Sequence, residues 1–376
     1  MHPLAHAWAK DRQELAKQGQ TWMSTACIFA LSFTIDEYSS HKDHLLYWKS
    51  LLNIGVKTAF SLGPEPMVIS IFLTCGLSLE IHREDSRLGT LLYDIFSTLG
   101  IKLDTPSIEY LGIYKIYALY LAHIGDSASS LQLLIQIAKI QDETLPRSHY
   151  KRLISQHELG RVYADNGEVE MAIKLLEQVV EDQEDLPITT PRRLASQHEL
   201  ARVYLAKGGK VKEAIEILEQ VVKIREEVLP IAHSNRLTSQ HELARVYLQN
   251  GQAERAQEIF EHVVKIREEV LSITHSDRLL SQHELGHAYL ENGQFEQAIR
   301  LLEHVVKIRE EVLPMSHSLR LASQHELAYA YHTDGQVEKA IELLEHVVKI
   351  EGEVLPANHS SRLISERALA LFKEEA

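Results

Sequence analysis

The pentapeptide that organises this chain reads Ser-Gln-His-Glu-Leu and occupies residues 239–243. Four further copies of it begin at serines on either side: Ser155, Ser196, Ser281 and Ser323. Successive copies start 41, 43, 42 and 42 residues apart, and a diverged sixth copy begins at Ser365 after another 42. A fixed period of this length indicates stacked structural repeats, because one unit cannot bury its apolar face without its neighbours.

Each unit contains two apolar stretches, and their spacing is helical. In the second stretch of one unit, Ile215, Leu218 and Val222 stand at i, i+3 and i+7, which places them on one broad stripe of a helix. A glycine closes the first stretch, as in Asn250-Gly251, because Gly and Asn accept the left-handed conformation that a helix end needs. Pro230 stops the second stretch. Each unit is therefore predicted to be a helix–turn–helix.

Polar residues between the units are predicted to be structural. The predicted N-caps of the first helices are four serines: Ser234, Ser276, Ser318 and Ser360. The histidine before each serine, such as His233, is expected to cap the helix or to remain exposed. Arginines near the start of the first helices, such as Arg236, are expected to form ion pairs with glutamates that end the second helices, such as Glu226.

The composition restricts the partners. The chain has 376 residues and a formal net charge of −14 at pH 7, which argues against the phosphate backbone of nucleic acid as a partner. Its two cysteines suit a reducing compartment. The first twenty residues carry five charged side chains, unlike a secretory signal, and the apolar run 21–35 is too short to span a bilayer. We therefore expect a soluble, cytoplasmic protein with no cofactor, no nucleic acid and no membrane partner.

Two motifs of each unit resemble the tetratricopeptide repeat, in its 42-residue, kinesin-light-chain-like form. Leu-Gly-x-x-Tyr stands at residues 159–163, and Ala-x-x-x-Phe stands at residues 256–260. The usual Trp of the first helix is replaced, as at Gln156, so the packing there is expected to differ. The resemblance covers about Arg152 to Phe372. It implies an all-α fold, a right-handed superhelical solenoid that binds a peptide or protein segment in a concave groove.

The repeat register predicts the division of the chain. An N-terminal helical region is expected at residues 1–105, with helical pairs at about 20–60 and 67–104. A tetratricopeptide array is expected at residues 106–376. Its predicted parts are a degenerate repeat at 106–146, five clear repeats at 152–356 and a C-terminal capping helix at 360–373.

The first twelve residues, Met1 to Arg12, resemble the segment that ends the winged-helix region of fungal NLR-like (STAND) signalling proteins. In that family the segment stands just before a repeat sensor, so the resemblance implies the ligand-sensing part of such a protein. No Gly-x-x-x-x-Gly-Lys-Ser/Thr motif occurs in the sequence, and Gly55-Val56-Lys57-Thr58 lacks the pattern that cradles phosphates. Nucleotide hydrolysis is therefore not expected.

The candidate ligand-binding residues occupy two positions, four residues apart, in the first helix of each repeat. They are His157 and Arg161, His198 and Arg202, His241 and Arg245, His283 and His287, and His325 and Tyr329. Residues at i and i+4 share a helix face, and the resemblance implies that both positions line the groove. Arginine forks favour an anionic ligand, either a peptide with acidic groups or a small anionic molecule. Alternatively, each histidine bonds Glu or Gln of the next repeat in an internal polar ladder.

One segment imitates a metal site. His283-Glu284-Leu285-Gly286-His287 matches the His-Glu-x-x-His pattern of zinc proteases. However, His-Glu-Leu is the repeat consensus and only this unit carries the second histidine, so neither a metal nor a catalytic residue is predicted. The predicted function is a scaffold that binds a peptide or protein segment. Two alternatives stay open: an enzyme that uses His/Arg acid–base chemistry on a small molecule in the groove, and a self-associating module.

Overall fold

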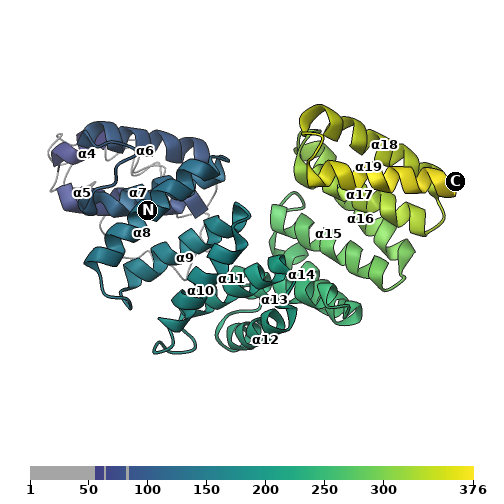
Figure 1. Ribbon diagram of the computed structural model, residues 1–376, viewed down its shortest axis with the longest axis horizontal. Coiled ribbons are helices and arrows are strands. Elements are labelled where there is room, and N and C mark those ends of the chain that lie inside the picture. The colour runs from purple at the N-terminus through teal and green to yellow at the C-terminus, as the bar shows by residue number, and fades with distance from the viewer. Residues whose placement is uncertain (1–55, 63–64, 82–83) are drawn as a thin grey trace, which may run out of the picture. The chain divides into compact units, whose positions relative to one another are not determined.

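The structure, a computed structural model, describes residues 56–62, 65–81 and 84–376 (Figure 1). These residues form α-helices joined by turns, with one short 3₁₀ helix and no strand. The predicted all-α class is confirmed. The chain divides into two compact units, residues 1–203 and residues 204–376.

The described helices of the first unit pack in chain order. They are α4 (Val56–Leu62), α5 (Glu65–Ile81), α6 (Asp85–Leu99), η2 (Ile108–Tyr110), α7 (Leu111–His123), α8 (Ser127–Thr144), α9 (Tyr150–Asp165) and α10 (Val169–Glu181). Helices α4 to α9 contribute to one apolar core, which includes Phe72, Leu92 and Tyr114. Helix α11 (Pro191–Lys207) carries the boundary between the units.

Helices α5 and α6 coincide with the pair predicted at 67–104. The pair predicted at 20–60 lies outside the described residues, apart from α4 at its end. The division of the chain at residue 105 stays a prediction.

The second unit repeats one packing pattern. Its helices are α12 (Val211–Val228), α13 (Ser234–Gln249), α14 (Ala253–Val270), α15 (Ser276–Glu291), α16 (Phe295–Val312), α17 (Ser318–Thr333), α18 (Val337–Val354) and α19 (Ser360–Glu375). Each helix packs against the next, as the green-to-yellow helices α15 to α19 show in Figure 1, and α15 also contacts α13 and α17. Phe260, Leu302 and Leu344 hold one position of successive second helices and are fully buried. The sequence period is therefore also the period of the core.

The turns follow the prediction, whereas the caps differ from it by one residue. Gly251 has a φ of 72°, in the left-handed region that closes helix α13. The predicted serine N-caps are wrong, because Ser234 already lies inside helix α13 and His233 is the cap. The Nδ1 atom of His233 accepts a hydrogen bond from the backbone N–H of Asn235 at 3.2 Å. The imidazole thus satisfies an N–H that the first helical turn leaves without a partner.

The glutamine at the usual tryptophan position has a specific partner. Gln240 donates from Nε2 to Oε1 of Glu226, at the end of the preceding second helix, at 2.6 Å. Gln282 bonds Glu268 in the same way at 2.6 Å. The same glutamates approach the arginines near the start of the first helices, with Arg236 Nη2 3.9 Å from Glu226 Oε1. A polar clamp between repeats therefore stands where an aromatic side chain is usual, and the predicted ion pairs are present at Arg236, Arg278 and Arg320.

Candidate functional site

Three histidines of the candidate set contact the following repeat. Each bonds a serine there through Nδ1: His157 with Ser196 at 3.4 Å, His241 with Ser281 at 3.1 Å, and His283 with Ser323 at 3.2 Å. His241 is only 2% exposed. An internal polar ladder therefore connects these repeats, with serine as the partner instead of the expected Glu or Gln.

Two of these serines, Ser281 and Ser323, also bind arginines that the sequence analysis did not single out. Arg267 donates from Nη1 to Ser281 Oγ at 2.5 Å and to the backbone carbonyl of Asp277 at 2.9 Å. Arg309 donates to Ser323 Oγ and to the carbonyl of Leu319 at 2.8 Å. One signal could have revealed them: Arg267 follows the buried Phe260 by seven residues, which places it on the apolar stripe of α14.

These contacts define two buried triads, each with one residue from three successive helices. The first triad is His241, Arg267 and Ser281, and the second is His283, Arg309 and Ser323. In each triad the serine oxygen accepts from the guanidinium, which leaves its O–H free to donate to the histidine. Burial lowers the pKa of Arg309 to about 10. The guanidinium is therefore charged at neutral pH and forms a cationic centre between repeats.

The histidine of the second triad is neutral. Burial, the charge of Arg309 and the neighbouring His287 lower the pKa of His283 to about 3. Burial likewise lowers the pKa of His325. A neutral imidazole accepts a hydrogen bond from the serine through one ring nitrogen, so these histidines act as acceptors within the repeat junctions.

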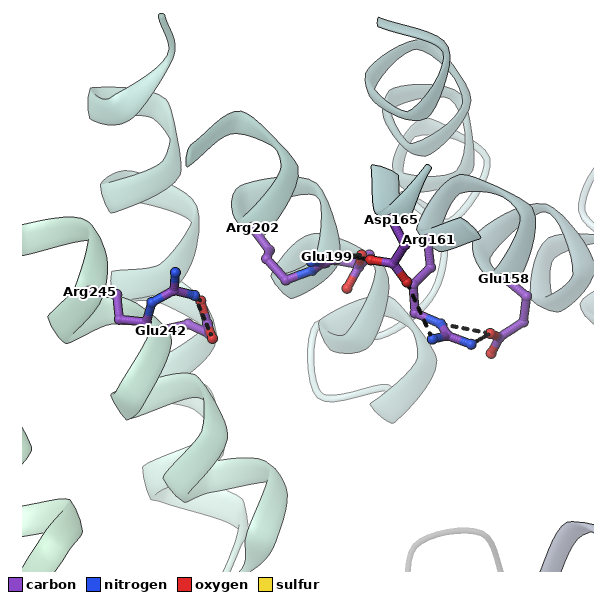
Figure 2. Close-up of polar contacts among 7 residues, drawn as sticks. All are labelled: Glu158, Arg161, Asp165, Glu199, Arg202, Glu242 and Arg245. Atoms are coloured by element: carbon purple, nitrogen blue, oxygen red, sulfur yellow. Dashed lines mark hydrogen bonds and ion pairs between the residues drawn. The ribbon is translucent and has the colours of Figure 1, made fainter. Parts of the chain in front are cut away.

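The candidate arginines four residues later are more exposed, and each has a carboxylate partner in its own helix (Figure 2). The N–O distances are 3.1 Å for Arg161 and Glu158, 2.6 Å for Arg202 and Glu199, and 3.0 Å for Arg245 and Glu242. In the first unit, Arg202 also reaches Asp165 of the preceding repeat at 3.1 Å. These guanidiniums are therefore compensated within the protein.

The second unit gathers further carboxylates at this level. Glu284 lies 3.7 Å from Arg245, and Glu326 lies 3.6 Å from His287. Burial raises the pKa of Glu284 although Arg245 opposes it. Burial also raises the pKa of Glu326, and the charge of His287 acts against this. A cation bound beside Glu284 and Glu326 would stabilise their charged forms, because its attraction would compensate for the hydration that burial removes.

The two candidate positions thus differ in accessibility. The histidine position contacts neighbouring repeats, whereas Arg202, Arg245 and His287 keep 32%, 39% and 40% of their side chains exposed, and Tyr329 is 45% exposed. We call the second group the i+4 row: Arg161, Arg202, Arg245, His287 and Tyr329. Ligand contact at either position stays a prediction.

The metal-like segment lies within this network. His283 bonds Ser323, while His287 approaches Glu326 and Glu291. Among the described residues, no group of three or more His, Cys, Asp or Glu side chains is arranged to hold a metal ion. None of the described helices combines the length and the apolar character that crossing a membrane requires.

Helix pairs with a 42-residue period and polar junctions define an α-helical repeat scaffold. The sequence model of the tetratricopeptide repeat matches residues 155–227, 186–269, 235–311 and 277–353, which together make up more than half of the chain. The chain belongs to the tetratricopeptide repeat family.

Several solved structures are similar. A crystal structure of nearly identical tetratricopeptide-like repeats from a Podosopora anserina protein, described as a kinesin light chain, is 53% identical; the match covers 55% of this chain and 96% of that one, with a TM-score of 0.48. A STAND protein with a tetratricopeptide repeat sensor from Pyrococcus horikoshii is 12% identical, over 92% of this chain and 50% of that one, with a TM-score of 0.61. A Rap protein complexed with Competence and Sporulation Factor is 11% identical; the match covers 88% of this chain and 96% of that one, with a TM-score of 0.58. The last two show a shared fold. No curated protein sequence matches the chain.

Proposed function

We propose that this chain is a scaffold that binds a peptide or protein segment along the face formed by the first helices of the repeats in its second unit. The observation that carries the proposal is the part of the i+4 row in the second unit, Arg245, His287 and Tyr329, whose side chains recur once per repeat and remain accessible, whereas His241 at the histidine position is buried. A recurring accessible row suits an extended ligand, because each repeat offers one contact to it. Membership of the tetratricopeptide family supports this choice.

We infer that basic groups suit the second unit better than the acidic groups suggested by the arginines. A ligand carboxylate would have to displace Glu199 from Arg202 or Glu242 from Arg245, so its net gain is small. In contrast, Glu284 and Glu326 are mostly buried, and their ion-pair partners lie further away: Arg245 is 3.7 Å from Glu284 and His287 is 3.6 Å from Glu326. A basic group there would compensate charges that burial disfavours.

Two of the similar structures support a sensing role for this chain. The Pyrococcus horikoshii protein has a tetratricopeptide repeat sensor, and the Rap protein was solved with a bound factor. We propose that capture of a ligand segment is likewise the sensing event of this chain. The enzymatic alternative, His/Arg acid–base chemistry on a small molecule in the groove, stays a prediction.

Binding to labelled peptides of matched length and opposite charge tests the proposal. We expect basic peptides to bind, and the double variant Glu284→Gln, Glu326→Gln to weaken them by about tenfold or more. The matched control is Glu258→Gln, Glu342→Gln, which removes the same charge from exposed positions of the second helices. Preference for acidic peptides, with loss of binding in the Arg202→Ala, Arg245→Ala variant, would reverse the inferred charge. Binding that none of these variants alters would overturn the proposed face.

A further inference from the structure

A third set of three residues stands in register with the two buried triads, but it has a different side chain at the arginine position. Adding 42 to the second triad gives His325, Glu351 and Ser365. The histidine and the serine are kept, whereas a glutamate replaces the arginine. This third set lies between α17, α18 and α19, at the last repeat junction of the chain.

The Glu351 side chain lacks the hydrogen-bond partners that the arginine has at the equivalent position of the first two triads. Glu351 is 4% exposed, and its Oε2 atom has no hydrogen-bond partner among the described residues. The Nε2 atom of His325 is also buried and has no hydrogen-bond partner among the described residues. A buried carboxylate without a partner is costly, because nothing replaces the water it has lost.

A cavity of about 340 Å³ lies at this junction. Its lining includes His325, Glu326, Glu351, Ser361 and Ser365. His283 of the second triad also lines the cavity, whereas Arg309 and Ser323 do not, so the central side chain is next to open space only at this last junction. The volume is within the lower range of small-ligand pockets, and it is lined by both apolar and polar groups.

The second triad shows which group would fit. There the guanidinium of Arg309 donates to the carbonyl of Leu319 and to Ser323 Oγ. The residues 42 positions later are Ser361 and Ser365, and both line the cavity. The last junction therefore keeps the acceptors of a guanidinium, and it adds a carboxylate where the protein's own guanidinium stood.

We propose that the cavity between α17, α18 and α19 binds a guanidinium group supplied by a ligand. The Glu351 carboxylate accepts two parallel N–H groups, and Ser365 Oγ and the Ser361 carbonyl accept the others. His325 is an acceptor as well, since burial keeps it neutral and it does not repel the cation. Glu326 adds a second negative charge at the cavity wall. The inference rests on the proposed function only for the origin of the guanidinium, an arginine of the bound segment.

Titration calorimetry with the full chain tests the cavity alone when the probe is agmatine, an alkylguanidinium that also carries a terminal ammonium group. We expect agmatine to bind, and Glu351→Gln, which keeps the shape and removes the charge, to weaken it at least tenfold. Glu353→Gln is the matched control, because it removes the same charge from an exposed position of the same helix. The absence of agmatine binding at millimolar concentration, or equal affinity in Glu351→Gln, would overturn the proposal.

A second variant restores the pattern of the other repeats. Glu351→Arg supplies the junction with its own guanidinium, so agmatine binding should disappear while the melting temperature is kept or raised. Persistence of binding in this variant would contradict the proposed position of the ligand. The melting temperature separates loss of the site from loss of the fold.

A peptide arm separates the two sources of the guanidinium. Acetyl-Gly-Arg-Gly-amide is compared with the same peptide carrying citrulline, which has the same shape without the charge. If agmatine binds while longer peptides of any charge do not, the cavity proposal stands and the proposed function fails. If longer peptides bind equally well to the wild type and Glu351→Gln while agmatine does not bind, the cavity proposal fails alone.

Discussion

The two units differ at one buried position of their repeat junctions. In the first unit this position is neutral, with Gln141 and Gln183 at 5% and 2% exposure. In the second unit it is cationic at Arg225, Arg267 and Arg309, and it becomes anionic at Glu351. The helices around the position keep the same lengths and order across the second unit. A fixed helical frame therefore accepts three kinds of side chain, and the partners of that side chain decide whether the junction is closed or open to a ligand.

The closed junctions owe their stability to the buried guanidinium. Arg309 holds the start of α17 through a carbonyl and a serine, and its removal leaves both acceptors buried. The open junction at Glu351 has no equivalent bond from its centre. The following measurements test this difference.

Removal of Arg309 is expected to have the largest effect. Arg309→Ala deletes hydrogen bonds from a charged donor and leaves a void, so the free energy of unfolding should fall by about 3 kcal/mol. Urea denaturation measures the change. The control is Arg300→Ala on the same helix, whose side chain is 66% exposed and pairs with Glu296 at 3.5 Å, and it should cost no more than about 0.5 kcal/mol. Equal losses in the two variants would show that the junction guanidinium is not special.

The second-largest effect is expected from acid, which should lower the free energy of unfolding through the closed junction at His283. The pKa of His283 is about 3 in the folded chain, against an ordinary value of 6.5. Between these pH values the unfolded chain binds a proton that the folded chain does not, so stability falls as pH falls, by up to about 1.4 kcal/mol per pH unit from this group. Urea midpoints measured from pH 6.5 to pH 4.5 give the slope. His283→Gln should make the slope shallower, and an unchanged slope would contradict a buried neutral His283.

Much of this fold follows from the sequence, because periodicity reports which helix face is buried. The spacing of Phe260, Leu302 and Leu344 and the position of Gly251 suffice for the helix pairs and their turns. Periodicity does not identify the atom that a polar side chain meets. The Glu or Gln expected opposite His241 is Ser281 for this reason, since both kinds of residue recur with the same period.

The candidate site was harder to predict for a related reason. Arg267 stands in a charged run, Lys-Ile-Arg-Glu-Glu, and composition alone favours a solvated helix end. Only its register with the apolar stripe indicates burial. The special character of Glu351 emerges when its column is compared across repeats, because a lone glutamate in a helix otherwise favours the surface.

The histidine caps should have the smallest effect, and they should not distinguish the units. His149 caps α9 in the first unit and His275 caps α15 in the second, each accepting from the N–H two residues later at 3.2 Å. His275→Ala leaves that N–H without its partner and should cost about 1 kcal/mol, and His149→Ala should cost about the same. His275→Asn keeps a capping side chain and should lose only a few tenths of this amount, as measured by urea denaturation. Equal costs in the two units would locate their difference at the buried junction position; a loss confined to one unit would show that the caps also differ.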